Sequence, residues 1–234
     1  MPLGQDPSLG LRMTSKNMFK IEKFDLLVSV YIFCIAVAEL MGAKTFPLLK
    51  VLGYQLNASV AIFVLPLIFT INDVITEVFG KERTRSVIRS GLVVIGLILL
   101  VSLLFTYLPP SSRFQPSEKA YDAIFGLSAR IAAASLTAFT IAEFLDVIVF
   151  VRIRKILGKS KLWLRTNASN FIAQFVDTVI FMTLAFYSLD RDFNSNFIFL
   201  TSLVIPYWLL KSSMSIIETP LVYLGVRWLR PKKV

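Results

Sequence analysis

Residues 87–108, VIRSGLVVIGLILLVSLLFTYL, contain a single charged side chain, Arg89, close to their start. The hydrocarbon core of a bilayer is about 30 Å thick, and a helix needs about 20 apolar residues to cross it. The stretch therefore predicts a transmembrane helix. The whole chain has a matching composition, because 56% of its residues are hydrophobic and its mean hydropathy is +0.69. Such values are typical of an integral membrane protein.

Stretches of similar length and character lie on both sides of this one, and together they predict six transmembrane helices. Their bounds are residues 25–46, 57–79, 87–108, 122–151, 166–188 and 197–228. The extra length of the last can be absorbed by tilt or by breaks near Pro206 and Pro220, because proline removes a backbone donor. The predicted fold is an all-α integral membrane protein with one six-helix domain over residues 25–229. Residues 1–24 are expected to form a disordered cytoplasmic tail rather than a cleaved signal, and residues 230–234 a basic tail.

Lys and Arg are distributed unevenly over the connections between these spans. The connections on one side of the membrane carry 18 Lys and Arg residues, and those on the other side carry five. The side with more Lys and Arg is normally cytoplasmic. The basic connections are residues 1–24, 80–89, 152–165 and 227–234, and the poor ones are residues 44–50, 113–119 and 191. Both termini are therefore predicted to be cytoplasmic. The same distribution argues against nucleic-acid binding, since the basic residues sit in short loops between apolar segments.

Two acidic residues interrupt the second span, in the stretch LIFTINDVITEVFG at residues 67–80. Asp73 and Glu77 are four residues apart and share one helical face. From its depth we expect Asp73 to be buried and to need an internal partner, whereas Glu77 can reach cytoplasmic water. We interpret the pair as a gate at the cytoplasmic mouth. The alternative is a structural salt bridge with Lys81 and Arg85 on the same face.

The fourth span also carries charges that are costly to hold at membrane depth. Arg130 is predicted to clamp substrate or to form an ion pair, unless its side chain reaches the outer interface. Glu143 and Asp146 share a face further along. Asp146 can pair with the basic cluster that follows it, so it is assigned to the gate or to coupling, and Glu143 to substrate binding.

A polar stripe of Asn170, Gln174 and Asp177 begins the fifth span. Asp177 falls near the membrane midplane, where a carboxylate indicates a functional site. Lys211 lies at similar depth in the sixth span, with Glu218 below it as a further gate or coupling residue. Asp177 and Lys211 are predicted to pair, and that pair is structural unless a ligand can exchange for one partner.

The available residue types limit the chemistry of this polar core. The chain has no His and one Cys, so a disulfide and the usual metal motifs are excluded, and no cofactor or metal is expected. Carboxylates, amides and aromatic rings suit a small, planar molecule with several hydrogen-bond donors and acceptors. A nucleobase fits this description, although an amino acid or a vitamin fits it as well.

Several long motifs occur in the order seen in a known family. They are DVITEVFG, ARIAAAS, EFLDVIVF, WLRTNASNFIAQFVDTVIF and LKSSMSIIETPLVYLGV. In these motifs, over about residues 25–229, the chain resembles the queuosine precursor transporter family, whose members are also described as vitamin uptake transporters. The resemblance implies an inner-membrane protein that imports 7-deazaguanine precursors of queuosine: 7-cyano-7-deazaguanine, 7-aminomethyl-7-deazaguanine or queuine.

The resemblance also carries individual positions over to this chain. They are Lys44, Asp73, Glu77, Arg130, Ser135, Asp146, Trp163, Arg165, Ser169, Gln174, Asp177, Lys211 and Pro220. The chain departs from the family pattern at Glu39, Thr76 and Glu143. We hypothesise that Asp177 or Glu143 holds the donor edge of the substrate, with Gln174 and Asn170 beside it.

Other classes of function stay open. A substrate-binding subunit of an energy-coupling-factor vitamin importer would also have six helices. An intramembrane aspartyl enzyme could use Asp73 and Asp177, but the flanking motifs of such peptidases are missing, so no enzyme is predicted. A lipid-handling or scaffolding protein would not need the buried charges. The expected partners are a small planar substrate and the lipid bilayer, without nucleic acid. The oligomeric state is open, a homodimer included.

Overall fold

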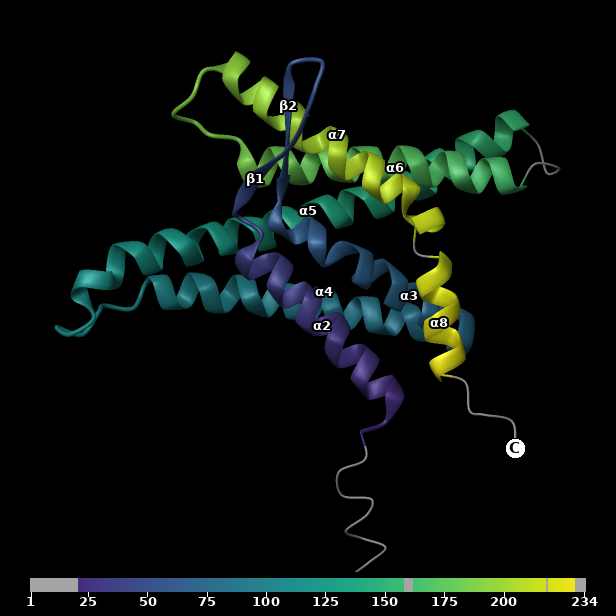
Figure 1. The fold of residues 1–234 in the computed structure, drawn as a ribbon, viewed down its shortest axis with the longest axis horizontal. Coiled ribbons are helices and arrows are strands. Elements are labelled where there is room, and N and C mark those ends of the chain that lie inside the picture. The colour runs from purple at the N-terminus through teal and green to yellow at the C-terminus, as the bar shows by residue number, and fades with distance from the viewer. Residues whose placement is uncertain (1–20, 158–161, 218, 230–234) are drawn as a thin grey trace, which may run out of the picture.

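The computed structural model describes residues 21–157, 162–217 and 219–229 (Figure 1). Within these ranges, the side chains at residues 143, 144, 146, 147, 149–151, 153–170 and 214–217 lie outside the description. The two predicted tails fall almost wholly outside it as well, at residues 1–20 and 230–234. The predicted site residues Glu143, Asp146, Asn170 and Glu218 therefore have no described side chain.

The described chain is mostly helical. Its α-helices are α2 (Lys23–Met41), α3 (Leu65–Phe79), α4 (Lys81–Thr106), α5 (Glu118–Leu157), α6 (Leu162–Phe186), α7 (Phe193–Ile217) and α8 (Thr219–Leu229). Two short 3-10 helices, η1 (Val60–Phe63) and η2 (Gln115–Ser117), precede α3 and α5. Gly80, at φ 85°, separates α3 from α4. Glycine adopts this left-handed conformation without steric cost, so the chain can turn between two helices in one residue.

Five segments of the described chain are long and apolar enough to cross a membrane. They are Lys23–Met41, Val60–Phe79, Lys81–Thr106, Gln115–Ala142 and Phe193–Ser213. A shorter apolar stretch, Phe171–Phe186, forms the second part of α6. Each of these segments overlaps one of the predicted spans, and five of them are long enough to cross a membrane within the described residues.

The sixth predicted span is divided into two helices, as expected, but at only one of the two prolines. Pro206 lies inside α7, which continues to Ile217. α8 begins at Thr219, directly before Pro220. Proline is tolerated in the first turn of a helix, where its missing N–H has no partner to lose. The helix is therefore not broken at Pro206, whereas near Pro220 two helices, α7 and α8, flank residue 218, which lies outside the described residues.

A β-hairpin joins α2 to α3, and the sequence interpretation did not include it. Strands β1 (Thr45–Val51) and β2 (Tyr54–Ser59) pair antiparallel, with Thr45 opposite Ser59. Leu52 and Gly53 form its turn, with φ values of 50° and 83°. Two central residues with positive φ give the turn type that matches the twist of paired strands. The first predicted span therefore ends earlier than residue 46, and the second begins later than residue 57.

The hairpin is held against α7 by polar contacts. The Tyr54 hydroxyl donates to the carbonyl oxygen of Ile198, and the Asn57 amide donates to the Ser202 hydroxyl at 2.7 Å. Figure 1 shows the two strands crossing in front of α7. At the start of α7, Asp192 accepts hydrogen bonds from the hydroxyl and backbone N–H of Ser195, at 2.6 and 2.9 Å. These hydrogen bonds lower the pKa of Asp192 and cap the helix.

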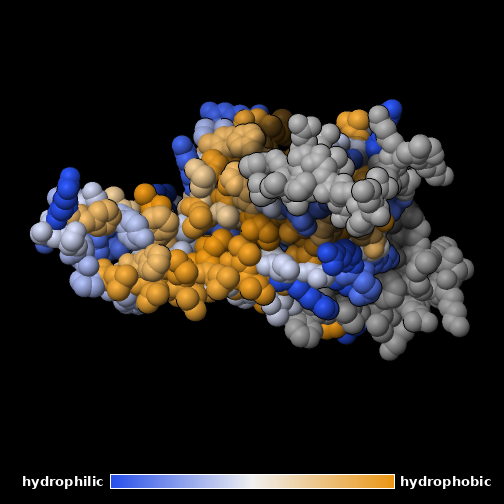
Figure 2. All heavy atoms as spheres, turned by 90° about the horizontal axis from the view of Figure 1, so that it is seen from below, coloured by the Kyte–Doolittle hydropathy of each residue, from blue (hydrophilic) through white to orange (hydrophobic). Residues whose placement is uncertain are grey.

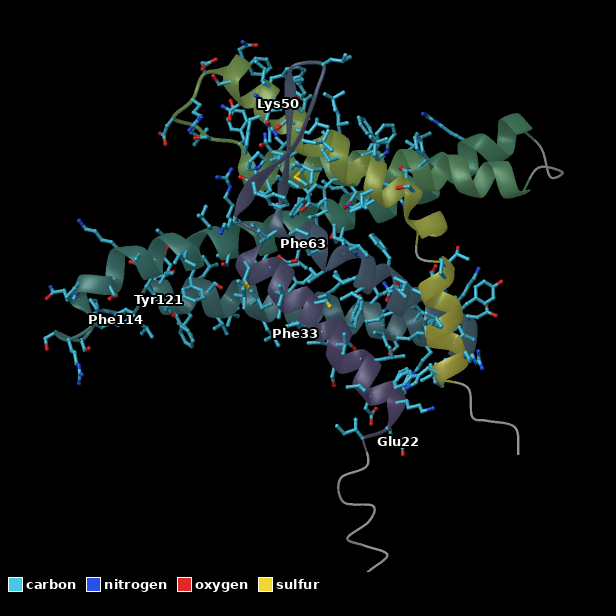
Figure 3. All side chains as sticks on the ribbon, viewed as in Figure 1. Glu22, Phe33, Lys50, Phe63, Phe114 and Tyr121 are labelled. Carbon is cyan, nitrogen blue, oxygen red and sulfur yellow. The ribbon has the colours of Figure 1, made fainter. Side chains whose placement is uncertain are left out.

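α5 is the central long element of the fold. Its 40 residues correspond to about 60 Å of helix, roughly twice the thickness of a bilayer core. α4 runs beside its first part and α6 beside its second part (Figure 1). Where α4 ends and α5 begins, the rings of Phe114 and Tyr121 meet edge to face, with 5.7 Å between their centroids (Figure 3).

Two of the apolar clusters of the described core join several elements each. One joins α2, α3, α4 and α5 and includes Ile75 and Ala132, both with no exposed surface. The other joins β2, α6 and α7 and includes Met182 and Leu203. Gly91 lets α4 approach α2 closely, since a Cβ there would lie 2.7 Å from the Cδ1 atom of Ile35.

Apolar side chains also cover much of the outside. Figure 2 shows a hydrophobic area across the middle of one face, with hydrophilic side chains towards both ends. Large exposed residues such as Phe33, Leu97 and Leu100 are between 55 and 64% exposed. Exposed apolar area on this scale marks a surface that water does not cover. The distribution is that of a protein whose middle is surrounded by lipid.

Candidate functional site: a polar cavity at the centre of the helices

A cavity of about 240 Å³ lies where the six long helices meet. Residues of α2, α3, α4, α5, α6 and α7 line it, and Ser59 of β2 and Ala61 of η1 complete one side. Most of the wall is apolar, and a small number of polar side chains is set into it. These are Tyr31, Glu39, Ser59, Ser135, Asp177, Thr178, Tyr207 and Lys211. A mostly apolar lining with a few convergent polar groups is typical of a site for a small molecule.

An ion pair between α6 and α7 stands in this wall. The Lys211 ammonium donates to the Oδ2 atom of Asp177 at 2.6 Å, and the two side chains are 15% and 25% exposed. The predicted pairing of Asp177 with Lys211 is thereby confirmed. Because the partial burial removes water from both charges, each depends on the other or on a ligand for its stabilisation.

Glu39, on α2, is a second acidic group in the same cavity. It is 6% exposed, and Ser135 of α5 lines the same cavity. The Oε2 atom of Glu39 is buried without a hydrogen-bond partner. The sequence interpretation noted Glu39 only as a departure from the family pattern. The signal was available, because Glu39 is the one charged residue between residues 26 and 43.

Hydroxyl groups connect the hairpin to the helices at one side of the cavity. The Tyr207 hydroxyl donates to the carbonyl oxygen of Ser59 at 2.9 Å, and the Ser59 hydroxyl donates to the carbonyl oxygen of Gly42. Tyr207 and Ser59 are 3% and 2% exposed. This network fixes the position of β2 between the end of α2 and the middle of α7, so the hairpin closes one wall of the site.

Aromatic rings supply further wall area. Tyr31, Phe139 and Phe181 line the cavity from α2, α5 and α6. Flat apolar faces next to carboxylate and ammonium groups can hold a planar ring that also carries polar atoms at its edge. The described residues contain no group of three His, Cys, Asp or Glu that could hold a metal ion.

Arg130 lies outside the cavity, with an exposed side chain. Its guanidinium donates to the carbonyl oxygens of Leu184, at 2.7 Å, and of Tyr187. These carbonyls belong to the last turn of α6 and to the residue that follows the helix. Cations stabilise helix C-termini, where the carbonyl groups have no partners within the helix. In this structure Arg130 therefore joins α5 to the end of α6.

The other members of the predicted site either lie outside the cavity lining or have no described side chain. Gln174 is half-buried on α6 but does not line the cavity. Asn170 and Glu143 have no described side chains, and the same holds for the gate candidates Asp146 and Glu218. The structure thus brings Asp177 and Lys211 together with Glu39 and Ser135, and it leaves Arg130 and Gln174 apart from them.

Asp73 and Glu77 are both exposed on α3, and neither lines the cavity. The expected burial of Asp73 was therefore wrong. The buried face of α3 consists of Thr70, Ile71, Val74 and Ile75, and it points Asp73 away from the core. Depth along a helix does not fix the direction of a side chain around its axis. Asn72 is the polar neighbour that turns inward, towards Tyr31.

Comparison with known proteins places these features in a family. Residues 59–225 match the family model described as "Putative vitamin uptake transporter". The chain is 31% identical over 195 residues to the probable queuosine precursor transporter of Bacillus subtilis strain 168. That alignment covers 82% of this chain and 79% of the relative.

Two other relatives align over about half of their length. The probable queuosine precursor transporter of Haemophilus influenzae Rd is 35% identical over 123 residues, which is 52% of this chain and 49% of the relative. The queuosine precursor transporter of Escherichia coli K12 is 31% identical over 128 residues, or 53% of each chain. No solved structure matches the chain. From the family match and the long Bacillus alignment, the chain belongs to the vitamin uptake transporter family, as a multi-pass protein of the bacterial inner membrane and not an enzyme.

Proposed function

We propose that this protein imports 7-deazaguanine precursors of queuosine across the bacterial inner membrane as a secondary transporter. The observation that carries the proposal is the central cavity, in which a partly buried ion pair and aromatic rings face one space. The names of three relatives, each called a queuosine precursor transporter, point to the substrate class. The candidates are 7-cyano-7-deazaguanine, 7-aminomethyl-7-deazaguanine and queuine.

The chemistry of the ring matches the ion pair. A deazaguanine has a carbonyl oxygen, a ring N–H and an exocyclic amine along one edge. In our proposal the Lys211 ammonium donates to the carbonyl oxygen and the Asp177 carboxylate accepts the neighbouring ring N–H. The substrate thereby exchanges for part of the contact between Asp177 and Lys211. Aromatic side chains of the wall, such as Phe139 and Phe181, cover the faces of the ring.

The proposal also includes the residues predicted beside this site. Glu143 and Asn170 stay candidates for the substrate edge. Arg130 and Gln174 do not line the described cavity, so a role for them in binding requires a different conformation of the helices. Asp73, Glu77, Asp146 and Glu218 stay proposed gate or coupling residues at the cytoplasmic side.

The proposed topology has six spans with both termini in the cytoplasm. The distribution of Lys and Arg over the loops supports it. A contact between the ends of the described chain supports it as well. Lys23, at the start of α2, donates to the backbone carbonyl of Trp228, near the end of α8, so these two ends of the described chain are adjacent. A reporter protein that is active only in the cytoplasm is expected to be active when it is fused to either terminus. A reporter that is active only outside the cytoplasm is expected to be inactive there.

Uptake by cells tests the substrate assignment. In bacteria that cannot make 7-cyano-7-deazaguanine and lack their own importer, the protein is expected to restore accumulation of the labelled compound. The Asp177→Ala variant, expressed at the normal level, is expected to lose most of this uptake, whereas Glu82→Ala on the exposed face of α4 is expected to keep it. Uptake at the wild-type rate by Asp177→Ala would contradict the role of this site.

A further inference from the structure

The least satisfied polar group in the cavity is the carboxylate of Glu39. Its side chain is more than nine-tenths buried, and its Oε2 atom has no hydrogen-bond partner. A buried carboxylate oxygen without a donor is costly, because it has lost water without gaining a replacement. The site therefore has an unused acceptor in its wall.

The charged groups that share the cavity do not supply the missing donor. Among the described residues, Asp177 and Lys211 are the other charged side chains of the lining. The Lys211 ammonium donates to Asp177, and the described residues contain no cation within ion-pairing distance of Glu39. Tyr31 and Tyr207 are the titratable neutral groups of the same wall, and the Tyr207 hydroxyl donates to Ser59.

The two acidic groups lie on different helices, α2 and α6, with the cavity between them. A planar ring that places its carbonyl oxygen and ring N–H at the ion pair of α6 and α7 leaves the next polar group on that edge free. On a guanine-type ring this group is the exocyclic amine, which carries two N–H donors. A ring without the amine leaves Oε2 of Glu39 without a donor.

We propose that Glu39 is a specificity-determining residue that accepts a hydrogen bond from the exocyclic amine of the substrate. The inference rests on the proposed function, since it assumes that a deazaguanine occupies this cavity. It assigns to Glu39 the selection of guanine-type rings against hypoxanthine-type rings, which lack only that amine. A site built to pair with a donor rejects the analogue that lacks it, because the buried acceptor then stays unpaired.

The experiment compares two ligands on purified full-length protein in detergent. Calorimetry measures the affinity for 7-cyano-7-deazaguanine and for 7-cyano-7-deazahypoxanthine. Wild-type protein is expected to prefer the first by about tenfold or more, the usual effect of one hydrogen bond to a charged group. Glu39→Met, which is similar in length but has no acceptor, is expected to bind both rings equally. Glu82→Met, at an exposed glutamate of α4, is expected to keep the preference.

The other outcomes distinguish the proposed substrate class from the proposed role of Glu39. If wild-type protein binds neither ring, the proposed substrate class is wrong and the inference is overturned with it. If wild-type protein prefers the guanine-type ring and Glu39→Met prefers it equally, the substrate class stands and the role of Glu39 is overturned. If Glu39→Met does not fold, Glu39→Leu decides, because it also removes both acceptor oxygens. A lost preference in Glu39→Leu supports the proposal, and an unchanged preference overturns it.

Discussion

Lys211 and Asp177 face each other from neighbouring helices inside an apolar bundle, where an isolated charge is expensive. The sequence could predict this pairing because both residues fall at similar depth and have opposite charge. It could not predict that Glu39 joins them. Residues far apart in the chain share a cavity only through the rotation and tilt of each helix, and the hydrophobic pattern of a lipid-surrounded helix gives little information about that rotation.

The ion pair predicts different effects on stability and on transport. Lys211→Met leaves the Asp177 carboxylate without its cation, and we expect it to lower the free energy of unfolding by about 1–3 kcal/mol. This is less than the loss for a fully buried pair, because both side chains are partly exposed. The double variant Lys211→Met with Asp177→Leu is expected to regain most of that loss. Thermal unfolding in detergent measures both effects.

Uptake separates the two roles of the pair. All of these variants are expected to lose uptake of the labelled precursor, including the double variant with restored stability. A double variant that is less stable than Lys211→Met would contradict the expected cost of the unpaired charge. A stable double variant with normal uptake would show that the pair is structural only.

Arg130 is expected to act on stability and not on binding. Arg130→Met removes the hydrogen bonds to the carbonyl oxygens of Leu184 and Tyr187, and we expect a loss of about 1–2 kcal/mol in the free energy of unfolding. Affinity for 7-cyano-7-deazaguanine is expected to stay within about threefold of wild type. Arg113→Met, in the exposed loop before α5, serves as the matched control. A large loss of affinity at unchanged stability would identify Arg130 as a substrate clamp instead.

At the scale of elements, two glycines of α4 allow a direct test of helix packing. A Cβ on Gly91 would lie 2.7 Å from the Ile35 side chain of α2, whereas a Cβ on Gly96 would meet nothing within 4 Å. Gly91→Ala is therefore expected to destabilise the protein by about 1–3 kcal/mol. Gly96→Ala is expected to be neutral or slightly stabilising, because alanine favours the helix. Thermal unfolding compares them, and equal effects would contradict the close approach of α2 and α4.

The helices and the hairpin differ in how far the sequence predicted them. Long apolar runs such as residues 87–108 defined their helices closely, since a span needs a minimum length. The hairpin was missed because residues 45–59 are short strands that continue the apolar character of the helices on either side. Its turn at Leu52 and Gly53 is stabilised by pairing, and β2 also contacts α7, more than 140 residues away in sequence. Such long-range contacts leave little local signal.

At the scale of the whole molecule, the membrane explains features that would be faults in water. The apolar outside, the long α5 and the few polar groups collected around one cavity belong together in a lipid-surrounded protein. Two acidic side chains and one ammonium group are kept in that cavity although burial makes them costly. We attribute this cost to recognition of a polar planar substrate.

Transport by the purified chain in liposomes tests this central claim most directly. The chain is expected to carry labelled 7-cyano-7-deazaguanine into vesicles without any other protein and without ATP, and Asp177→Ala is expected to abolish this transport. Binding of the compound without transport would contradict a secondary transporter and favour the substrate-binding subunit of a larger importer. Transport at the wild-type rate by Asp177→Ala would contradict the assignment of the central cavity as the substrate site.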